Sequence, residues 1–340
     1  MKIDSFSPTI RRKEMDAVLT TMVQERIGPG EQAQKLIQYA RELIGYEHCI
    51  ALRSPVMALY YALKALSLPS GCEVVISALS PSYYYCVICD AGYIPIYADV
   101  DELGAQLTVE SVQAVLSPQT GAIVVHHALG YVPDVPALIE LGIPVIEDCS
   151  RSYGSHWLEK RSGSFASLSI LALEERDILT AGGGALLYAM NKREASVLRQ
   201  FKDLPMEYLL PDMNAALAWV QFREDEKNRG RRREIAKIFR QASARTRHRS
   251  LVQQGESEYN NYTFALVLET GLKDVKQYAS RKEVSVEAAF DDTVLAVHPL
   301  ETSHCPNANS LILRTVRFPL YPRLKQTEIA KISKVLASLP

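Results

Sequence analysis

The sequence predicts an α/β protein with a mostly parallel sheet, followed by a smaller α+β domain in the C-terminal third. The chain has 340 residues, of which 47% are apolar and 23% charged, a balance that supports a full-sized buried core. Chains longer than roughly 250 residues tend to divide their core into two domains. Short β-rich runs alternate with helix-length segments through the first half, which indicates βαβ crossovers and a sheet covered on both faces.

Two helical patterns come first, between Arg11 and Gly45, on either side of a turn at residues 27–30 that contains two glycines and a proline. The alternation of strands and helices follows. Strands are expected at 48–53, 73–79, 93–100, 122–127 and 144–148, and helices at 56–66, 83–91, 109–116 and 135–141. Ligands of such sheets bind beyond the carboxyl ends of the strands.

The pattern changes after Phe165. Two adjacent strands are expected at 165–173 and 184–189, and then a long helix at 213–244 with a candidate break at Gly230. The remainder predicts a strand at 262–268 and helices at 273–281 and 326–336. We therefore expect a large domain of residues 12–225 and a small domain of residues 226–340, with residues 1–11 as a candidate addition to the small domain.

Charge and apolar runs exclude several classes of partner. The chain has 38 Lys and Arg residues and 39 Asp and Glu residues, so it has no overall field that attracts nucleic acid. Its apolar runs fall short of the ~18 residues that span a bilayer, and the first residues have no apolar signal core. We therefore expect a cytoplasmic protein with neither a nucleic-acid nor a membrane partner.

The six cysteines are scattered, as in proteins of a reducing compartment. Cys86 and Cys89 form a single CxxC pair without a second pair or suitably spaced histidines. We expect this pair on the core face of a helix, with redox or zinc chemistry much less favoured, and no metal site is predicted.

An ordered set of short motifs runs through nearly the whole chain. The motifs are Ser54–Leu59, Asp99–Asp101, His127–Gly130, Glu147–Gly154, Gly182–Gly184, Tyr208–Leu217 and Phe318–Pro322. Their order and spacing resemble the DegT/StrS family of pyridoxal-phosphate (PLP) sugar aminotransferases, in the aspartate aminotransferase superfamily. The resemblance implies the type I PLP-transferase fold and a homodimer with its cofactor near the subunit boundary. It also implies amino-group transfer from glutamate to a keto sugar on a nucleotide carrier.

The resemblance assigns cofactor roles to several residues. Asp148 matches the carboxylate that keeps the pyridine nitrogen protonated. Ser54, Pro55 and Val56 match the helix start that holds the phosphate, and Ser169 matches a second phosphate-binding hydroxyl. Ser54 and Pro55 are typical of a helix N-terminus. Because Pro55 has no N–H and Val56 has no hydroxyl, we expect this helix start to bind a phosphate only weakly.

The resemblance also indicates which residues would contact the pyridine ring and its phenolic oxygen. The aromatic residue that stacks on the ring aligns with Pro81, and the nearby tyrosines, Tyr83 to Tyr85, offer a replacement, of which Tyr83 is the candidate. Arg151 stands where the family has a glutamine and is a candidate partner for the phenolic oxygen, or else a surface charge.

The lysine that the family uses to bind PLP covalently has no counterpart. Counting forward from Ser169 places it at Glu174, and counting back from Gly184 places it at Arg176. Residues 161–190 contain no lysine. Arginine cannot replace it, because a pKa above ~12 leaves no free nucleophilic nitrogen at neutral pH.

Three functional hypotheses therefore compete. The leading one is a non-catalytic or regulatory protein of nucleotide-sugar or polysaccharide metabolism, which forms a homodimer or pairs with an active paralogue. The second is a lysine-independent enzyme, such as a sugar dehydratase, that binds PLP, its amine form (PMP) or another ligand such as a nucleotide sugar non-covalently, with His127 or Glu174 as acid and base. His127 is more often a structural histidine in such a position. The third is an ordinary PLP aminotransferase whose lysine lies elsewhere.

Overall fold

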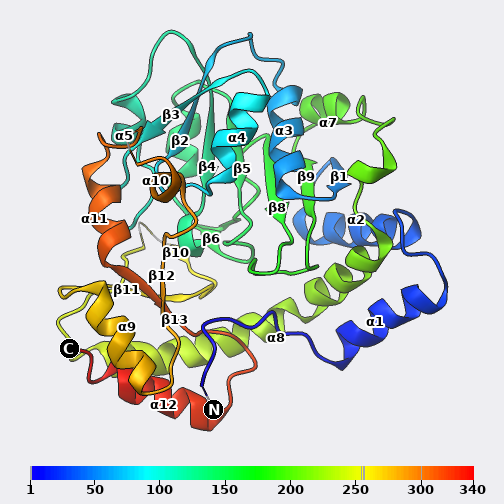
Figure 1. The fold of residues 1–340 in the computed structure, drawn as a ribbon. Coiled ribbons are helices and arrows are strands. Elements are labelled where there is room, and N and C mark those ends of the chain that lie inside the picture. Colours follow the sequence, from blue (N-terminus) through cyan, green and yellow to red (C-terminus); the bar gives the residue numbers. More distant parts are fainter. Residues whose placement is uncertain (1, 254, 256, 300) are drawn as a thin grey trace.

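A seven-stranded sheet forms the centre of the computed structural model, which describes residues 2–253, 255, 257–299 and 301–340 (Figure 1). The strand order is β1-β9-β8-β5-β4-β2-β3, and β9 runs antiparallel to both of its neighbours, β1 and β8, whereas the other pairs are parallel. The strands are β1 (His48–Leu52), β2 (Glu73–Ser77), β3 (Ile94–Ala98), β4 (Thr120–His126), β5 (Val145–Asp148), β8 (Leu168–Ala172) and β9 (Ala185–Ala189). The predicted α/β fold with a mostly parallel sheet is confirmed.

Short helices connect these strands and cover the sheet (Figure 1). Several begin at a side-chain cap that satisfies a free backbone N–H, among them α3, where Ser54 accepts a hydrogen bond from the Met57 N–H and Pro55 occupies the first turn. The connecting helices are α3 (Pro55–Ala65), α4 (Tyr83–Asp90), α5 (Val109–Gln113), η1 (Ala128–Gly130), α6 (Val135–Ile139), α7 (Lys192–Leu198) and η2 (Met206–Tyr208).

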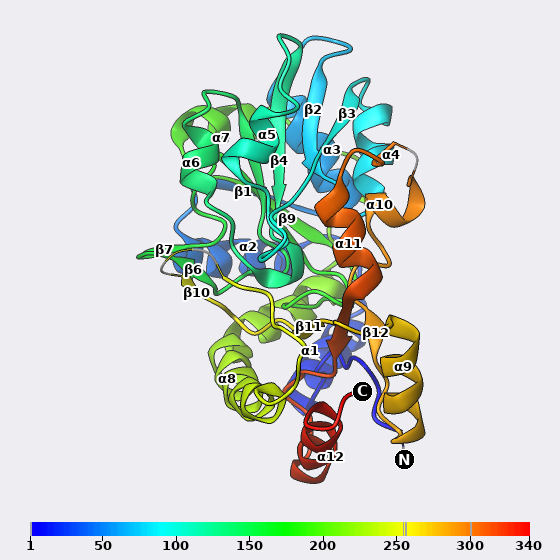
Figure 2. The same cartoon turned by 90° about the vertical axis from the view of Figure 1, so that its left-hand side faces the viewer.

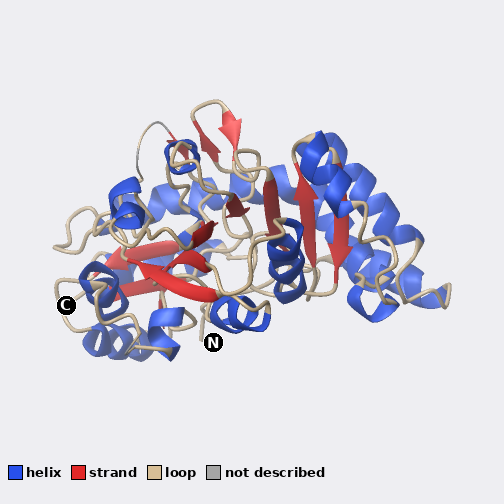
Figure 3. Ribbon diagram, turned by 90° about the horizontal axis from the view of Figure 1, so that it is seen from above, coloured by secondary structure: helices blue, strands red, loops and turns tan. Residues whose placement is uncertain are grey.

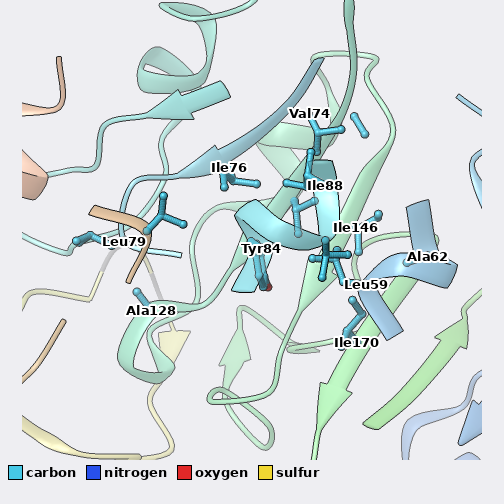
Figure 4. Close-up of a cluster of buried hydrophobic side chains, with 14 of the residues drawn as sticks. Leu59, Ala62, Val74, Ile76, Leu79, Tyr84, Ile88, Ala128, Ile146 and Ile170 are labelled. Carbon is cyan, nitrogen blue, oxygen red and sulfur yellow. The ribbon is translucent and has the colours of Figure 1, made fainter. Parts of the chain in front are cut away.

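Helix α4 carries tyrosine and aliphatic side chains into the core. Tyr84 and Ile88 lie among Leu59, Ile76 and Ile146 in the close-up of Figure 4. Because α4 buries this face, Cys86 and Cys89 fall on the opposite one and are exposed, so their predicted place on the core face is wrong. In the described part of the chain no group of three His, Cys, Asp or Glu residues could hold a metal ion.

Helix α8 (Asp212–Ser243) runs the length of the molecule beneath the sheet, past α1 (Arg12–Val23) and α2 (Glu31–Ile44) toward α12 (Gln326–Leu336) (Figure 1). The candidate break at Gly230 is absent. One glycine costs a helix only about 1 kcal/mol, and buried residues such as Ile235 and Phe239 beyond Gly230 hold the helix in place. No helix of the described residues is long and apolar enough to cross a membrane.

The C-terminal part forms the predicted smaller α+β unit, beside the central sheet in Figure 3. Its antiparallel sheet has the order β11-β13-β12, and Ile3 near the N-terminus pairs with Val284 and joins its core. The elements are β11 (Phe264–Val267), α9 (Leu272–Arg281), β12 (Glu287–Ala288), α10 (Val294–Val297), α11 (Pro306–Arg314), β13 (Thr315–Phe318) and α12.

The two cores are joined in two places. Helix α8 crosses residues 225 and 226 without interruption. Helices α10 and α11 lie against α4 and the sheet in Figure 2, and their side chains Leu295 and Leu311 belong to the core of the central sheet. The domain boundary at residue 225 stays a prediction.

A second small sheet was not expected from the sequence. It has the order β10-β6-β7, and its strands are β6 (His156–Trp157), β7 (Lys160–Arg161) and β10 (Ser257–Glu258). Strands of two residues have no alternation of apolar and polar residues, so periodicity could not reveal them.

The turn before β9 generates a prediction about stability. Gly184 has a φ of +123°, and a Cβ there would lie 2.3 Å from the Leu210 Cδ1, in a fully buried side chain. Gly184→Ala should therefore lower the free energy of unfolding by about 3 kcal/mol or more. Gly182 has a φ of +69° with open space around it, so Gly182→Ala should cost only about 1 kcal/mol. Urea denaturation measures both, and equal losses would contradict the close packing of this turn.

Candidate active site

A pocket of about 290 Å³ opens at the carboxyl ends of β4, β5 and β8. These strands end at His126, Asp148 and Ala172, and all three residues line the pocket. Pro55 at the start of α3 and Asp292 from the C-terminal part line it as well. The pocket therefore lies where a parallel sheet brings strand ends and helix N-termini together.

Asp148 is the most heavily bonded side chain of the pocket. Its Oδ1 accepts hydrogen bonds from the backbone N–H of Ser150, at 2.9 Å, and from the Ser150 hydroxyl. Its Oδ2 accepts one from the Tyr84 hydroxyl and lies 3.3 Å from the His126 Nδ1. Burial alone would raise the pKa of Asp148, but His126, Ser150 and Tyr84 outweigh it and hold the pKa well below its usual range.

His126 is the histidine that lines the pocket, and sequence reasoning missed it. It lies directly beside Asp148 in the parallel register of β4 and β5. Its ring is 3% exposed, and its Nε2 is buried with no hydrogen-bond partner in the described structure. The signal that could have found it is strand alternation, because two consecutive histidines at a strand end point to opposite sides of the sheet.

His127 does not line this pocket. Its Nδ1 lies 2.6 Å from the Ser152 Oγ, and its Nε2 lies 3.5 Å from the Glu147 Oε1. Burial, followed by the charge of His126, lowers the pKa of His127 to about 3, so the ring is neutral at pH 7. Burial also raises the pKa of Glu147 to about 7. The catalytic role of His127 stays a prediction, and its surroundings are those of a structural histidine.

Arg151 also lines the pocket. Its Nη2 lies 2.9 Å from the Asp292 Oδ2, and its guanidinium lies over the ring of Tyr262, 5.9 Å from the centroid. Burial raises the pKa of the nearby Asp177 to about 7, although the charge of Arg151 opposes that shift. Arg151 is therefore a largely buried partner of Asp292 in the pocket, rather than a surface charge.

Glu174 and Arg176, the two candidates for the lysine position, both line the pocket but are held differently. The Glu174 Oε1 lies 3.4 Å from the backbone N of Gly184, in the glycine turn. Arg176 reaches toward the C-terminal sheet, where its two Nη atoms lie 2.7 and 3.3 Å from the Glu287 carboxylate. No lysine is among the described residues that line the pocket.

The residues predicted at the phosphate end are only partly brought together. Pro55 lines the pocket, the Ser54 Oγ accepts from the Met57 N–H at 3.3 Å, and Val56 is 44% exposed. Ser169 is fully buried with an unpartnered hydroxyl and does not line the pocket. Tyr83, the predicted stacking residue, does line it.

The residues present do not fit a covalently attached, phosphate-anchored PLP. Its ring nitrogen would have to add a fifth donor to Asp148, which already has four within its own chain. The pocket is lined by five acidic side chains and only two arginines. This excess of acidic side chains disfavours a bound phosphate. Among the described residues that line the pocket, no lysine offers an amine to bond the cofactor.

The Tyr84 hydroxyl provides a test of this network. Tyr84→Phe removes one donor from a buried carboxylate, so it should lower the free energy of unfolding by about 1–3 kcal/mol. The folded-state pKa of Asp148 lies below the unfolded value of ~3.9, so the carboxylate is ionised in both states above about pH 5. The loss should therefore be constant from about pH 5 to 8 and should diminish only as the pH falls toward the folded-state pKa.

Chemical denaturation across this pH range measures the effect. Tyr208→Phe is the matched control, because Tyr208 is 40% exposed, and it should change stability by less than about 0.5 kcal/mol. An unchanged stability of Tyr84→Phe would show that Tyr84 does not bond Asp148.

Comparisons with known proteins agree with the fold. Among solved structures, the aminotransferase TlmJ from Streptoalloteichus hindustanus has a TM-score of 0.91 at 21% identity, covering 98% of both chains. The putative sugar aminotransferase Spr1654 from Streptococcus pneumoniae, in its apo form, has a TM-score of 0.92 at 18% identity, covering 99% of this chain and 97% of that one. Spr1654 has also been solved in PMP and PLP forms.

Sequence comparison gives the same relationship. A UDP-N-acetyl-3-dehydro-alpha-D-glucosamine 3-aminotransferase of Acidithiobacillus ferrooxidans is 24% identical over 333 residues, which cover 90% of this chain and 88% of that relative. The model of the DegT/DnrJ/EryC1/StrS aminotransferase family matches residues 8–337. With its strand-end pocket and its mostly parallel sheet, the chain belongs to the DegT/DnrJ/EryC1/StrS aminotransferase family.

Proposed function

We propose that this chain is a member of its family that forms no covalent bond with PLP and acts as a non-catalytic or regulatory partner in nucleotide-sugar or polysaccharide metabolism. The observation that carries the proposal is the absence of a lysine from the described lining of the strand-end pocket. A covalent imine with an aldehyde requires a free amine, and at neutral pH an arginine has none.

The groups at the lysine position support this proposal because each already has a partner. Arg176 is paired with Glu287, and Glu174 reaches the glycine turn at Gly184. A carboxylate cannot condense with an aldehyde to form an imine. Neither side chain can therefore take over the covalent step.

An exposed apolar stripe supports a protein partner. Helix α1 and the turn after it expose large side chains at helical spacing, namely Met15, Leu19, Met22, Val23 and Ile27. Contiguous apolar surface of this kind is typical of protein interfaces. We propose that the stripe contributes to a homodimer or to a heterodimer with an active paralogue that supplies the lysine, in the cytoplasm.

A second function is favoured by one observation, the position of His126. A histidine whose Nδ1 is held by a carboxylate and whose Nε2 has no partner has the arrangement of a general base. In this alternative the chain is a lysine-independent enzyme, with PLP, PMP or a nucleotide sugar bound non-covalently, and His126 takes the role that the sequence assigns to His127.

The test is the absorption spectrum of the purified protein after addition of PLP. We expect no borohydride-reducible band at roughly 410–430 nm, where protonated imines of the cofactor absorb. The Streptococcus pneumoniae relative, which has been solved in a PLP form, is treated in parallel as the reference. A reducible band located in the pocket by peptide mapping would contradict the proposal and support an ordinary aminotransferase.

Two further results separate the remaining alternatives. Lys160→Arg and Lys192→Arg control for the nearest lysines in the sequence, both exposed, and neither change should alter the spectrum. Tight binding of PMP by calorimetry without the band would favour the lysine-independent enzyme. Absence of PLP and PMP binding, together with co-purification of a paralogue, is the result that the leading proposal predicts.

A further inference from the structure

One edge of the central sheet lies in an open groove. Strand β1 is the outermost strand on that side, and helices α2 and α7 lie against it (Figure 1). The groove has a volume of about 860 Å³ and is lined by residues 48–51 of β1, by residues of α2 and by segment 198–202. None of its described lining residues also lines the strand-end pocket. The groove is therefore a separate feature of the fold.

Helices α2 and α7 cover opposite faces of β1. Cys49 and Ala51 belong to the core that contains Leu36 of α2. Ile50, which points to the other face, belongs to the core that contains Leu198 of α7. A groove lined by both helices and by four consecutive strand residues therefore lies at the edge of β1, in the position that a further strand would take.

Part of the backbone along this edge has no partner. The Leu210 N–H donates to the Ala51 C=O at 3.1 Å, on the side of β1 away from β9. Since the N–H and C=O groups of alternate residues point to the same side of a strand, Cys49 faces this side as well. In the described structure no residue outside the sheet ladder bonds to the Ala51 N–H or to the N–H and C=O of Cys49. Beyond Leu210 the chain turns into α8 at Asp212 and covers no more of the edge.

The groove carries uncompensated positive charge. Lys35, Arg199 and Lys202 line it, and none of them has an ion pair in the described structure. Glu31 is the only acidic residue among the described lining residues, and its Oε1 lies 3.3 Å from the Arg26 Nη1. Uncompensated cations attract an acidic ligand and repel a basic one.

The shape and the charge of the groove together select its occupant. An added strand would direct its side chains alternately toward α2 and toward segment 198–202, where apolar residues such as Ile37 and Phe201 also line the groove. Its backbone would pair with the free groups of Cys49 and Ala51. The same edge of a second copy is disfavoured, because it would bring two sets of the same cations together.

We propose that the free edge of β1 binds an extended acidic segment of a partner protein as an added strand. Residues 48–51 span about 13 Å, so the bound segment is short, on the order of four to six residues. The inference goes beyond the proposed function and stands without it, because the groove and the strand-end pocket are separate.

Two synthetic hexapeptides test the charge preference. Fluorescence anisotropy at about pH 7 compares labelled Val-Glu-Val-Glu-Val-Glu with its lysine counterpart, Val-Lys-Val-Lys-Val-Lys. We expect the acidic peptide to bind at least about tenfold more tightly, because its carboxylates complement the cations of the groove. Equal or tighter binding of the lysine peptide would overturn the inference. So would the absence of binding, which would leave the cations as charges that protect a sheet edge from pairing.

Two methylated forms of the acidic peptide test the pairing with β1. One carries N-methyl groups on its valines and the other on its glutamates. In a paired strand only alternate N–H groups point to the neighbouring strand. One form should therefore lose at least about tenfold in affinity and the other less than about threefold. Equal affinities of the two forms would show that no strand is added.

Charge reversal locates the binding site. The double variant Arg199→Glu, Lys202→Glu changes two exposed residues and should weaken the acidic peptide at least about tenfold and strengthen the lysine peptide. Lys192→Glu, Arg193→Glu is the matched control, because these exposed residues of α7 do not line the groove. It should change either affinity by less than about twofold. Equal effects of the two double variants would contradict binding in the groove.

Sedimentation velocity of the same samples reports the alternative occupant, a second copy of the chain. We expect the Arg199→Glu, Lys202→Glu variant to keep the oligomeric state of the wild type. A dimer that dissociates in this variant, together with no peptide binding by the wild type, would assign the groove to an interface between copies and overturn the inference.

Discussion

The buried carboxylate of Asp148 is the constraint on which the site depends. An ionised group with almost no exposure is stable only if its oxygens are hydrogen-bonded, and here four donors come from Ser150, Tyr84 and His126. These residues belong to β4, to α4 and to the loop after β5, so one carboxylate ties three parts of the chain together. The position of α4 against the sheet and the orientation of the His126 ring both follow from it.

The same bonding supports the proposal that the pocket departs from the chemistry of its family. In a PLP enzyme the carboxylate is kept available for the ring nitrogen of the cofactor, whereas here the Tyr84 hydroxyl already occupies Oδ2. At the other end of the pocket, the residues that stand near the expected lysine are engaged with Glu287 and with the glycine turn. The charge of the pocket, the hydrogen bonds of Asp148 and the absence of a lysine from the described lining all support the proposed function.

The sequence predicted the order of the strands and helices because each long element has a clear period or cap, such as Ser54 before α3. It could not predict the two-residue strands, which have no period, nor the continuity of α8 through Gly230, which depends on tertiary packing. The place of Cys86 and Cys89 was wrong because an apolar run hides which face of a short helix is buried.

For the site, the motif order located Asp148, Arg151, Pro55 and Tyr83 in one pocket, together with both candidates for the lysine position. It did not distinguish His126 from His127, because the family motif contains only the second histidine. Nor did it reveal that Tyr84 bonds Asp148, since that contact depends on how α4 packs.

Diffraction from crystals soaked in PLP tests the central claim most directly. The account predicts no continuous density between a cofactor carbon and any side-chain nitrogen, with the Tyr84 hydroxyl still on Asp148. Continuous density to a lysine in the pocket, or a pyridine nitrogen in place of the Tyr84 hydroxyl, would contradict it.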